Sequence, residues 1–225
     1  MNLNSVSNSV DLTIIVPIYN GAKYCRSLYF KCLEVLKKSD RNYELIFVDD
    51  GSTDDTLTNL LTIQKEGNQL KIVKLHPNQG QHFALMQGLK KATGKAIIIM
   101  DDDQEFALDY IDVILQKFKA GYDCVFLWRN KRNISILRKL VSWMMNILIS
   151  GVTRKRIHDF GGTKAFGNRG ASLLYKHGSV LKMGKRLRHL SICEIKVNNA
   201  FIRYSRYDCK KLIRLFLQAL AAFIN

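Results

Sequence analysis

Residues 97–106 read IIIMDDDQEF, so four apolar residues are followed at once by three neighbouring carboxylates. The apolar run 96–100 is short and rich in Ile, which is typical of a buried strand. Carboxylates side by side repel one another unless a cation or solvent compensates their charge. The stretch therefore predicts a buried strand that leads into a site for a divalent cation.

The chain before and after this stretch alternates strand-like and helix-like segments. Short runs rich in Ile and Val indicate strands, and apolar residues that recur at helical spacing indicate helices. The expected strands are 12–17, 43–48, 70–75, 96–100 and 124–128. The expected helices are 22–38, 54–66, 81–92 and 109–119. This order predicts an α/β fold with a single, mostly parallel sheet flanked by helices.

Three of the expected strands end in polar loops, and ligands of such sheets bind at the carboxyl ends of strands. The loops are PIYNG at 17–21, DDGSTD at 49–54 and DDDQE at 101–105. Taken singly, the second loop also fits a tight turn with a helix N-cap, and the first a plain strand exit. In the third, an extended backbone would aim Asp101 and Asp103 to one side. Such oxygen ligands suit Mg²⁺ or Mn²⁺, which complete their shells with water and substrate phosphates.

Charge divides the 225-residue chain into two unlike halves. Residues 1–113 carry 12 Lys/Arg and 15 Asp/Glu, a balance of −3, whereas 114–225 carry 23 and 4, a balance of +19. A basic half of this kind binds nucleic acid, an anionic membrane leaflet or a phosphorylated ligand. Nucleic acid is not expected, because it would leave the acidic strand ends unexplained and no zinc-finger or RNA-recognition signature is present.

The cysteines and the N-terminus indicate a reducing compartment. The five cysteines are odd in number, widely spaced and form no CxxC pair, so neither a disulfide framework nor a zinc site is expected. The first ten residues, MNLNSVSNSV, lack the basic and apolar regions of a secretory signal. We therefore expect a cytoplasmic protein, with one domain as the working assumption for this length.

Four segments, in this order, resemble the family 2 glycosyltransferases with the GT-A fold, a Rossmann-like fold for nucleotide-diphosphate sugars. They are TIIVPIYNGAKY, ELIFVDDGSTDDT, NQGQHFALMQGLKKATGKAIIIMDDDQE and AGYDCVFLWRNKR. In that family a strand-end Pro and an Asp pair bind the nucleotide, and DxD carboxylates hold a metal on the diphosphate. The resemblance implies that the nucleotide-sugar is bound by Pro17, Tyr19, Asn20, Asp49, Asp50, Asn78, Gly80, Gln81 and Asp102.

The same resemblance implies a metal site at Asp101 and Asp103, with Asp103 also counted as catalytic. Glu105 stands where the most similar subgroup has a Gln that approaches the metal, so it joins the expected ligands of Mg²⁺ or Mn²⁺. Two features depart from the family pattern. Gly21 replaces an acid that many members have after the motif Asn, and Gly161-Gly162 replaces bulkier residues.

The subgroup that this chain most resembles is the polyprenyl-phosphate sugar synthases. There, equivalent Arg and Ser side chains receive the lipid phosphate, and guanidinium groups suit phosphate because they bind it with two parallel hydrogen bonds. The residues implied here are Arg129, Arg132, Arg138 and Ser142. The apolar stretch WMMNILIS that follows fits an amphipathic helix against acyl chains. A solvated basic helix face is the alternative for this region.

The end of the chain, 203–225, places basic residues before an apolar run. That run is about half of the roughly 20 residues that a membrane-spanning helix needs. We expect an interfacial helix on an anionic membrane surface, or a docking site for a small membrane subunit; a helix that caps the protein's own core is the alternative. The expected organisation is a GT-A domain at 1–205, with a donor half at about 10–128 and an acceptor half at about 129–205, followed by an amphipathic juxtamembrane helix at 206–225.

Together these features predict an inverting, metal-dependent transfer of a sugar from a nucleotide-diphosphate sugar to a polyprenyl phosphate at the inner face of the membrane. A lipid phosphate is already anionic and needs no general base. A saccharide acceptor in surface polysaccharide synthesis is the alternative, and its hydroxyl would need a base, for which Asp159 is the nearest match. A catalytically silent scaffold is disfavoured by the intact metal carboxylates.

Overall fold

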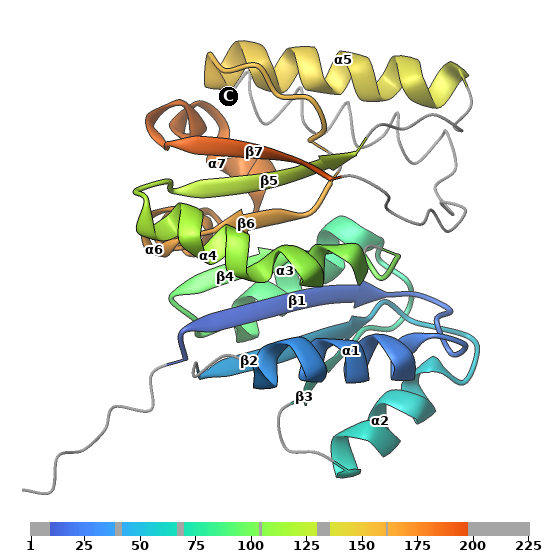
Figure 1. Ribbon diagram of the computed structural model, residues 1–225. Coiled ribbons are helices and arrows are strands. Elements are labelled where there is room, and N and C mark those ends of the chain that lie inside the picture. Colours follow the sequence, from blue (N-terminus) through green and yellow to red (C-terminus); the bar gives the residue numbers. More distant parts are fainter. Residues whose placement is uncertain are drawn as a thin grey trace, which may run out of the picture. The chain divides into compact units, whose positions relative to one another are not determined.

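The computed structural model describes residues 10–38, 42–66, 70–103, 105–129, 136–160 and 162–197 (Figure 1). The predicted helix at 206–225 and the predicted phosphate ligand Arg132 lie outside these ranges, as do the side chains of Arg129 and Arg138. None of the described helices is both long and apolar enough to cross a membrane.

In the part of the chain that the structure describes, seven strands form one sheet in the order β3-β2-β1-β4-β6-β5-β7. The pairs β1–β2, β2–β3 and β5–β7 are parallel, and β5–β6 is antiparallel. The expected α/β class with a mostly parallel sheet is therefore confirmed. The strands are β1 Leu12–Ile18, β2 Tyr43–Asp49, β3 Leu70–Lys74, β4 Ala96–Ile99, β5 Cys124–Arg129, β6 Lys164–Phe166 and β7 Ile192–Val197.

Helices connect most of these strands, as Figure 1 shows. The α-helices are α1 Cys25–Lys37, α2 Thr56–Glu66, α3 Gln81–Lys91, α4 Ile111–Lys119, α5 Ile136–Thr153, α6 Asn168–His177 and α7 Val180–Met183. The two 3₁₀ helices are η1 Glu105–Tyr110 and η2 Gly184–His189. The expected helix at 109–119 is thus an α-helix only from Ile111, because the residues before it wind more tightly.

The chain divides into two compact units, Met1–Ile98 and Ile99–Asn225. In the first unit, α1 and α3 cover opposite faces of the strands. The Tyr29 ring of α1 meets the Phe47 ring edge-on at 6.5 Å between centroids, whereas a Cβ on Gly88 of α3 would lie 2.9 Å from Val48 Cγ2. Phe47 and Val48 are successive residues of β2, so their side chains point to opposite faces.

In the second unit, β5 lies between β6 and β7. The buried Phe126 ring of β5 packs edge-on against Phe160 and Phe166, at 6.1 and 6.3 Å between centroids. Helix α4 contacts β5, α6 contacts β6, and α5 contacts η2. This core holds the residues that follow α5, including the turn that carries Asp159, against the strand β5.

Buried Glu44 joins the amino ends of three strands in the first unit. Its carboxylate accepts hydrogen bonds from the Thr13 hydroxyl at 2.5 Å and the Thr93 amide at 2.6 Å, and it pairs with Lys71 of β3. Burial by itself would raise the pKa of Glu44, but the hydrogen bonds from Lys71, Thr13 and Thr93 outweigh it and lower the pKa. The ionised form therefore stabilises the folded state.

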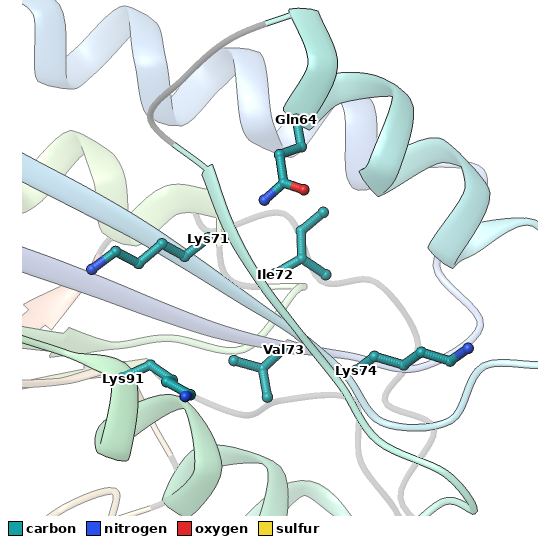
Figure 2. A pocket seen from close by; sticks show the side chains of 6 residues that line it. All are labelled: Gln64, Lys71, Ile72, Val73, Lys74 and Lys91. Carbon is teal, nitrogen blue, oxygen red and sulfur yellow. The ribbon is translucent and has the colours of Figure 1, made fainter.

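Beside this cluster, the edge strand β3 borders a shallow groove (Figure 2). It is lined by Gln64, Lys71, Ile72, Val73, Lys74 and Lys91, and the side chains of Ile72 and Val73 extend to opposite sides of β3 (Figure 2). Lysines on an exposed edge strand discourage pairing with other chains. We therefore assign this groove no ligand.

We predict that Glu44→Gln lowers the free energy of unfolding by about 1–3 kcal/mol at pH 7, because it removes charge-assisted hydrogen bonds from a buried site. The lowered pKa gives a stabilisation that is present above the ordinary glutamate range and is lost as pH falls through the folded-state pKa. Urea unfolding of both proteins at several pH values measures this. The difference between the two stabilities should shrink as pH falls from the ordinary glutamate range through the lowered pKa of Glu44, and a difference independent of pH would contradict the assignment.

Candidate functional site

The loop after β1 is held by side chains from the loop after β2. The Asn20 amide donates to Ser52 Oγ at 2.9 Å, and the Thr53 amide donates to Asn20 Oδ1 at 2.8 Å. Asn20 has a φ of 51°, a left-handed conformation that Asn tolerates better than most residues. The predicted nucleotide-binding residue Asn20 thus uses its side-chain oxygen to join the two loops.

Asp54 and Thr56 fix the next two backbone amides. Gly21 donates to Thr56 Oγ1 at 2.7 Å, Ala22 donates to Asp54 Oδ2 at 3.2 Å, and the Thr56 amide donates to Asp54 Oδ1 at 3.0 Å. Burial tends to raise the pKa of Asp54, but hydrogen bonds from the Thr56 hydroxyl and the Ala22 and Thr56 amides lower it overall. The loop after β1 is therefore held mainly by the side chains of residues 52–56.

Asp50 holds the loop before α3 in the same way, by accepting hydrogen bonds from it. Its carboxylate oxygens accept hydrogen bonds from the amides of Gln79 and Gly80, each at 2.9 Å, and its carbonyl accepts one from Asn78 Nδ2 at 2.8 Å. Gly51 has a φ of 70°, and a Cβ there would lie 2.6 Å from the Asn78 nitrogen. The close approach of these two loops therefore requires a glycine.

The structure thus brings together most of the residues predicted to bind the nucleotide-sugar in the first unit. Asp49 is buried at the end of β2 and accepts a hydrogen bond from the Ser52 amide at 3.3 Å, while the Tyr19 ring is exposed. Their binding roles stay predictions. The sequence analysis did not single out Ser52, Thr53, Asp54 and Thr56, because their partners lie more than 30 residues away in the chain and local spacing carries no sign of them.

The carboxylates after β4 belong to the second unit and are partly exposed. Strand β4 ends at Ile99, Met100 is buried, and residues 102 and 103 form a turn. The expected extended backbone from Asp101 to Asp103 is therefore wrong, because the chain turns before the third carboxylate. Among the described residues, no three His, Cys, Asp or Glu side chains are grouped so that they could hold a metal by themselves.

The predicted phosphate-binding residues fall at the end of β5 and on α5. Arg129 is the last residue of β5, and Arg138 and Ser142 lie on α5, where Ser142 is partly exposed. Asp159 is buried in the turn that follows α5. A Cβ on Gly162 would lie 2.2 Å from the Leu127 carbonyl oxygen and 3.6 Å from Asp159 Oδ2. Gly162 is the second glycine of the pair that departs from the family pattern. The chain there runs too close to β5 for a side chain.

Comparison with known proteins defines the family. The model of "Glycosyl transferase family 2" matches residues 13–182, and the chain belongs to this family. A dodecaprenyl-phosphate galacturonate synthase of Rhizobium johnstonii is 35% identical over 161 residues, which are 70% of this chain and 48% of that protein. An undecaprenyl-phosphate 4-deoxy-4-formamido-L-arabinose transferase of Klebsiella pneumoniae is 34% identical over 151 residues, 67% of this chain and 46% of that protein. The chain thus spans about half the length of these curated relatives.

Solved structures agree with the fold. Glucosyl-3-phosphoglycerate synthase of Mycobacterium tuberculosis, in complex with Mn²⁺, UDP-glucose and phosphoglyceric acid, aligns with a TM-score of 0.67 at 16% identity. The alignment covers 96% of this chain and 79% of that one. The complex of the same synthase with Mg²⁺ and UDP gives a TM-score of 0.66 at 17% identity, covering 96% of this chain and 78% of that one. The predicted GT-A fold is thereby confirmed.

We predict that Thr56→Val weakens nucleotide binding at least about tenfold, because the loop after β1 loses the acceptor of the Gly21 amide. Titration with UDP, GDP and dTDP in the presence of Mn²⁺ measures the affinity. Thr62→Val is the matched control on the same helix, since the Thr62 hydroxyl is exposed and donates only within α2, to the Thr58 carbonyl. Equal affinities of the two variants would contradict the role of Thr56.

Proposed function

We propose that this protein transfers a sugar from a nucleotide-diphosphate sugar to a polyprenyl phosphate, with inversion at the anomeric carbon. The family membership and the names of the two relatives, both of which act on polyprenyl phosphates, support this proposal. The observation that carries it is the pair of polar loops at the carboxyl ends of β1 and β2, which side-chain hydrogen bonds hold together where nucleotides bind in sheets of this kind.

In the proposed donor site, carboxylates from among Asp101, Asp103 and Glu105 would hold Mg²⁺ or Mn²⁺ together with the donor, since the described side chains form no group of three that could hold a metal by itself. These side chains are partly exposed carboxylates, and hard oxygen ligands of this kind fit either ion. A metal bound by few protein ligands would also bind substrate phosphates and water. When bound, the metal would neutralise the negative charge that develops on the diphosphate as the anomeric bond breaks. Asp102 would contact the nucleotide-sugar beside it.

The loops of the first unit would bind the nucleoside. Tyr19 has an exposed ring that can stack on a base, and Pro17 and Asp49 lie at the ends of β1 and β2. Asn20 and Asp50 would act through the loop backbone that they hold, so that Asn78, Gly80 and Gln81 present a fixed surface to the donor. Rigid loops favour transfer because the reacting groups are already oriented.

In the proposed acceptor site, Arg129, Arg132, Arg138 and Ser142 bind the lipid phosphate. The balance of +19 in residues 114–225 favours an anionic acceptor. The phosphate oxygen carries its charge before the reaction starts, so it attacks the anomeric carbon without a general base. Asp159 would then orient the reacting groups, and it would serve as a base only for a hydroxyl acceptor.

Helix α5 supports a peripheral association with the cytoplasmic face of the membrane. Four large apolar side chains on α5 are exposed, namely Leu140 at 49%, Trp143 at 59%, Met144 at 39% and Ile147 at 52%. Their spacing places them along one side of the helix. We call these four residues the apolar stripe. Beside an anionic leaflet, the stripe would enter the acyl boundary while the exposed Lys139, which directly precedes it, would meet the headgroups.

The direct test is the transfer of label from UDP-, GDP- or dTDP-sugars to undecaprenyl phosphate with Mg²⁺ or Mn²⁺. We expect label from one donor to enter the organic phase, and EDTA to prevent this. Asp103→Asn should reduce turnover by about 100- to 1,000-fold, the size of effect expected when a charge-stabilising group is lost. Circular dichroism should show that this variant remains folded. Retained turnover in Asp103→Asn would contradict the assignment of Asp103 as a metal ligand. Transfer to a saccharide and not to undecaprenyl phosphate would contradict the lipid phosphate as acceptor.

The apolar stripe gives a separate prediction. A Trp143→Ser, Ile147→Ser double variant should bind vesicles of phosphatidylglycerol at least about tenfold more weakly, because two large apolar side chains are lost from the interface. Co-sedimentation at physiological salt measures the binding. Phe30→Ser, Leu61→Ser is the matched control, since both residues are exposed on helices of the first unit. Equal binding by the two double variants would contradict a membrane role for α5.

A further inference from the structure

The turn at Ile157–Phe160 is fixed by side chains from two other elements. The Ile157 amide donates to Ser150 Oγ at 2.9 Å, and the His158 amide donates to Glu194 Oε1 at 2.9 Å. The side chain of Asn146 binds the backbone on both sides of the buried Asp159. Its Nδ2 donates to the His158 carbonyl at 2.6 Å, and its Oδ1 accepts from the Phe160 amide at 3.0 Å. Backbone groups on both sides of Asp159 are therefore bound.

The His158 side chain adds a further contact to this turn. Its Nδ1 lies 2.7 Å from Glu194 Oε2, and its ring stacks on Trp128 with 4.7 Å between centroids and an interplanar angle of 11°. Trp128 directly precedes Arg129 at the end of β5. The turn is thereby joined to the strand end where the acceptor phosphate is expected, as well as to β7 through Glu194.

Helix α5 presents two different sides. Ser142, Asn146 and Ser150 follow one another at intervals of four residues and lie along one side of the helix. Two of them hold the Asp159 turn, and the third is the predicted phosphate ligand. The apolar stripe begins two residues before Ser142 and ends one residue after Asn146. A single rigid helix thus carries the proposed membrane contact, a phosphate ligand and the support of the Asp159 turn.

We propose that Asn146 and Glu194 are positioning residues for the acceptor reaction: they hold the Asp159 turn in register with helix α5 and with the end of β5. This inference rests on the proposed function, because it takes α5 and Asp159 to lie on the acceptor side. Loss of either side chain removes hydrogen bonds that tie the backbone of this turn to α5 or to β7, so the turn shifts. The acceptor groups then lose their orientation, while the donor loops of the first unit keep theirs.

The test compares Asn146→Ala and Glu194→Ala with the wild type in the transfer assay. For each variant, kcat/KM for undecaprenyl phosphate should fall by at least about tenfold, as expected when hydrogen bonds that orient a reacting group are lost. The KM for the nucleotide-sugar should stay within about twofold. Glu194→Gln should recover most of the activity, because a Gln side chain can still accept from the His158 amide. Asn168→Ala is the matched control, an exposed Asn at the start of α6 in the same unit.

Fluorescence provides a readout that does not depend on turnover. Trp128 and Trp143 are the two tryptophans of the chain, so Trp143→Phe leaves Trp128 as a single reporter of its stacking on His158. In that background, Asn146→Ala should raise the Trp128 emission because the imidazole moves off the ring. Asn168→Ala should leave the emission unchanged.

The outcomes separate this inference from the proposed function. A wild-type protein that transfers no sugar to the lipid removes the proposed function, and the Trp128 emission then still decides whether Asn146 holds the turn. Transfer by the wild type with an unchanged acceptor kcat/KM in both alanine variants would overturn the inference. An equal fall in kcat/KM for the donor and for the acceptor would also overturn it. So would a fall in kcat/KM that only matches the fraction of unfolded protein.

Discussion

Backbone amides in the loops that follow strands and helices need hydrogen-bond partners. In this protein, side chains from neighbouring segments supply many of them. The side chains of Ser52, Asp54 and Thr56 accept hydrogen bonds from the loop after β1, Asn20 accepts one from the loop after β2, and Asp50 serves the loop before α3. Asn146, Ser150 and Glu194 serve the turn after α5 in the same way. Four of the expected nucleotide-binding residues, Asn20, Asp50, Asn78 and Gly80, therefore lie on loops that these hydrogen bonds hold together.

This constraint separates two kinds of polar residue in the motifs. Side chains such as Asp50 use both carboxylate oxygens on backbone amides, so in the proposed function they act on the ligand through the loop that they hold. Partly exposed side chains such as Asp101, Asp103 and Ser142 belong to the second kind and can face a ligand. The charges of the chain agree with the proposed sites. Carboxylates that suit a metal come before a basic half that suits an anionic acceptor.

Much of the fold could be predicted from sequence, because apolar periodicity reports directly on burial. The strand expected at 43–48 runs from Tyr43 to Asp49, and the helix expected at 81–92 runs from Gln81 to Lys91. Periodicity carries no information about the turn at residues 102 and 103, which breaks the expected alternation of Asp101 and Asp103. The roles of Thr56 and Asn146 could not be predicted either, since their partners are set by tertiary contacts and not by local spacing.

The central claim is that this chain moves a sugar, without its phosphate, onto a lipid phosphate. The nucleotide released during the reaction tests this most directly, with labelled nucleotide-sugar, undecaprenyl phosphate and Mn²⁺ present together. The account predicts release of the nucleoside diphosphate in equal amount to the lipid-linked sugar, and neither product after EDTA. Release of the nucleoside monophosphate, or of diphosphate that does not depend on the lipid phosphate, would contradict it.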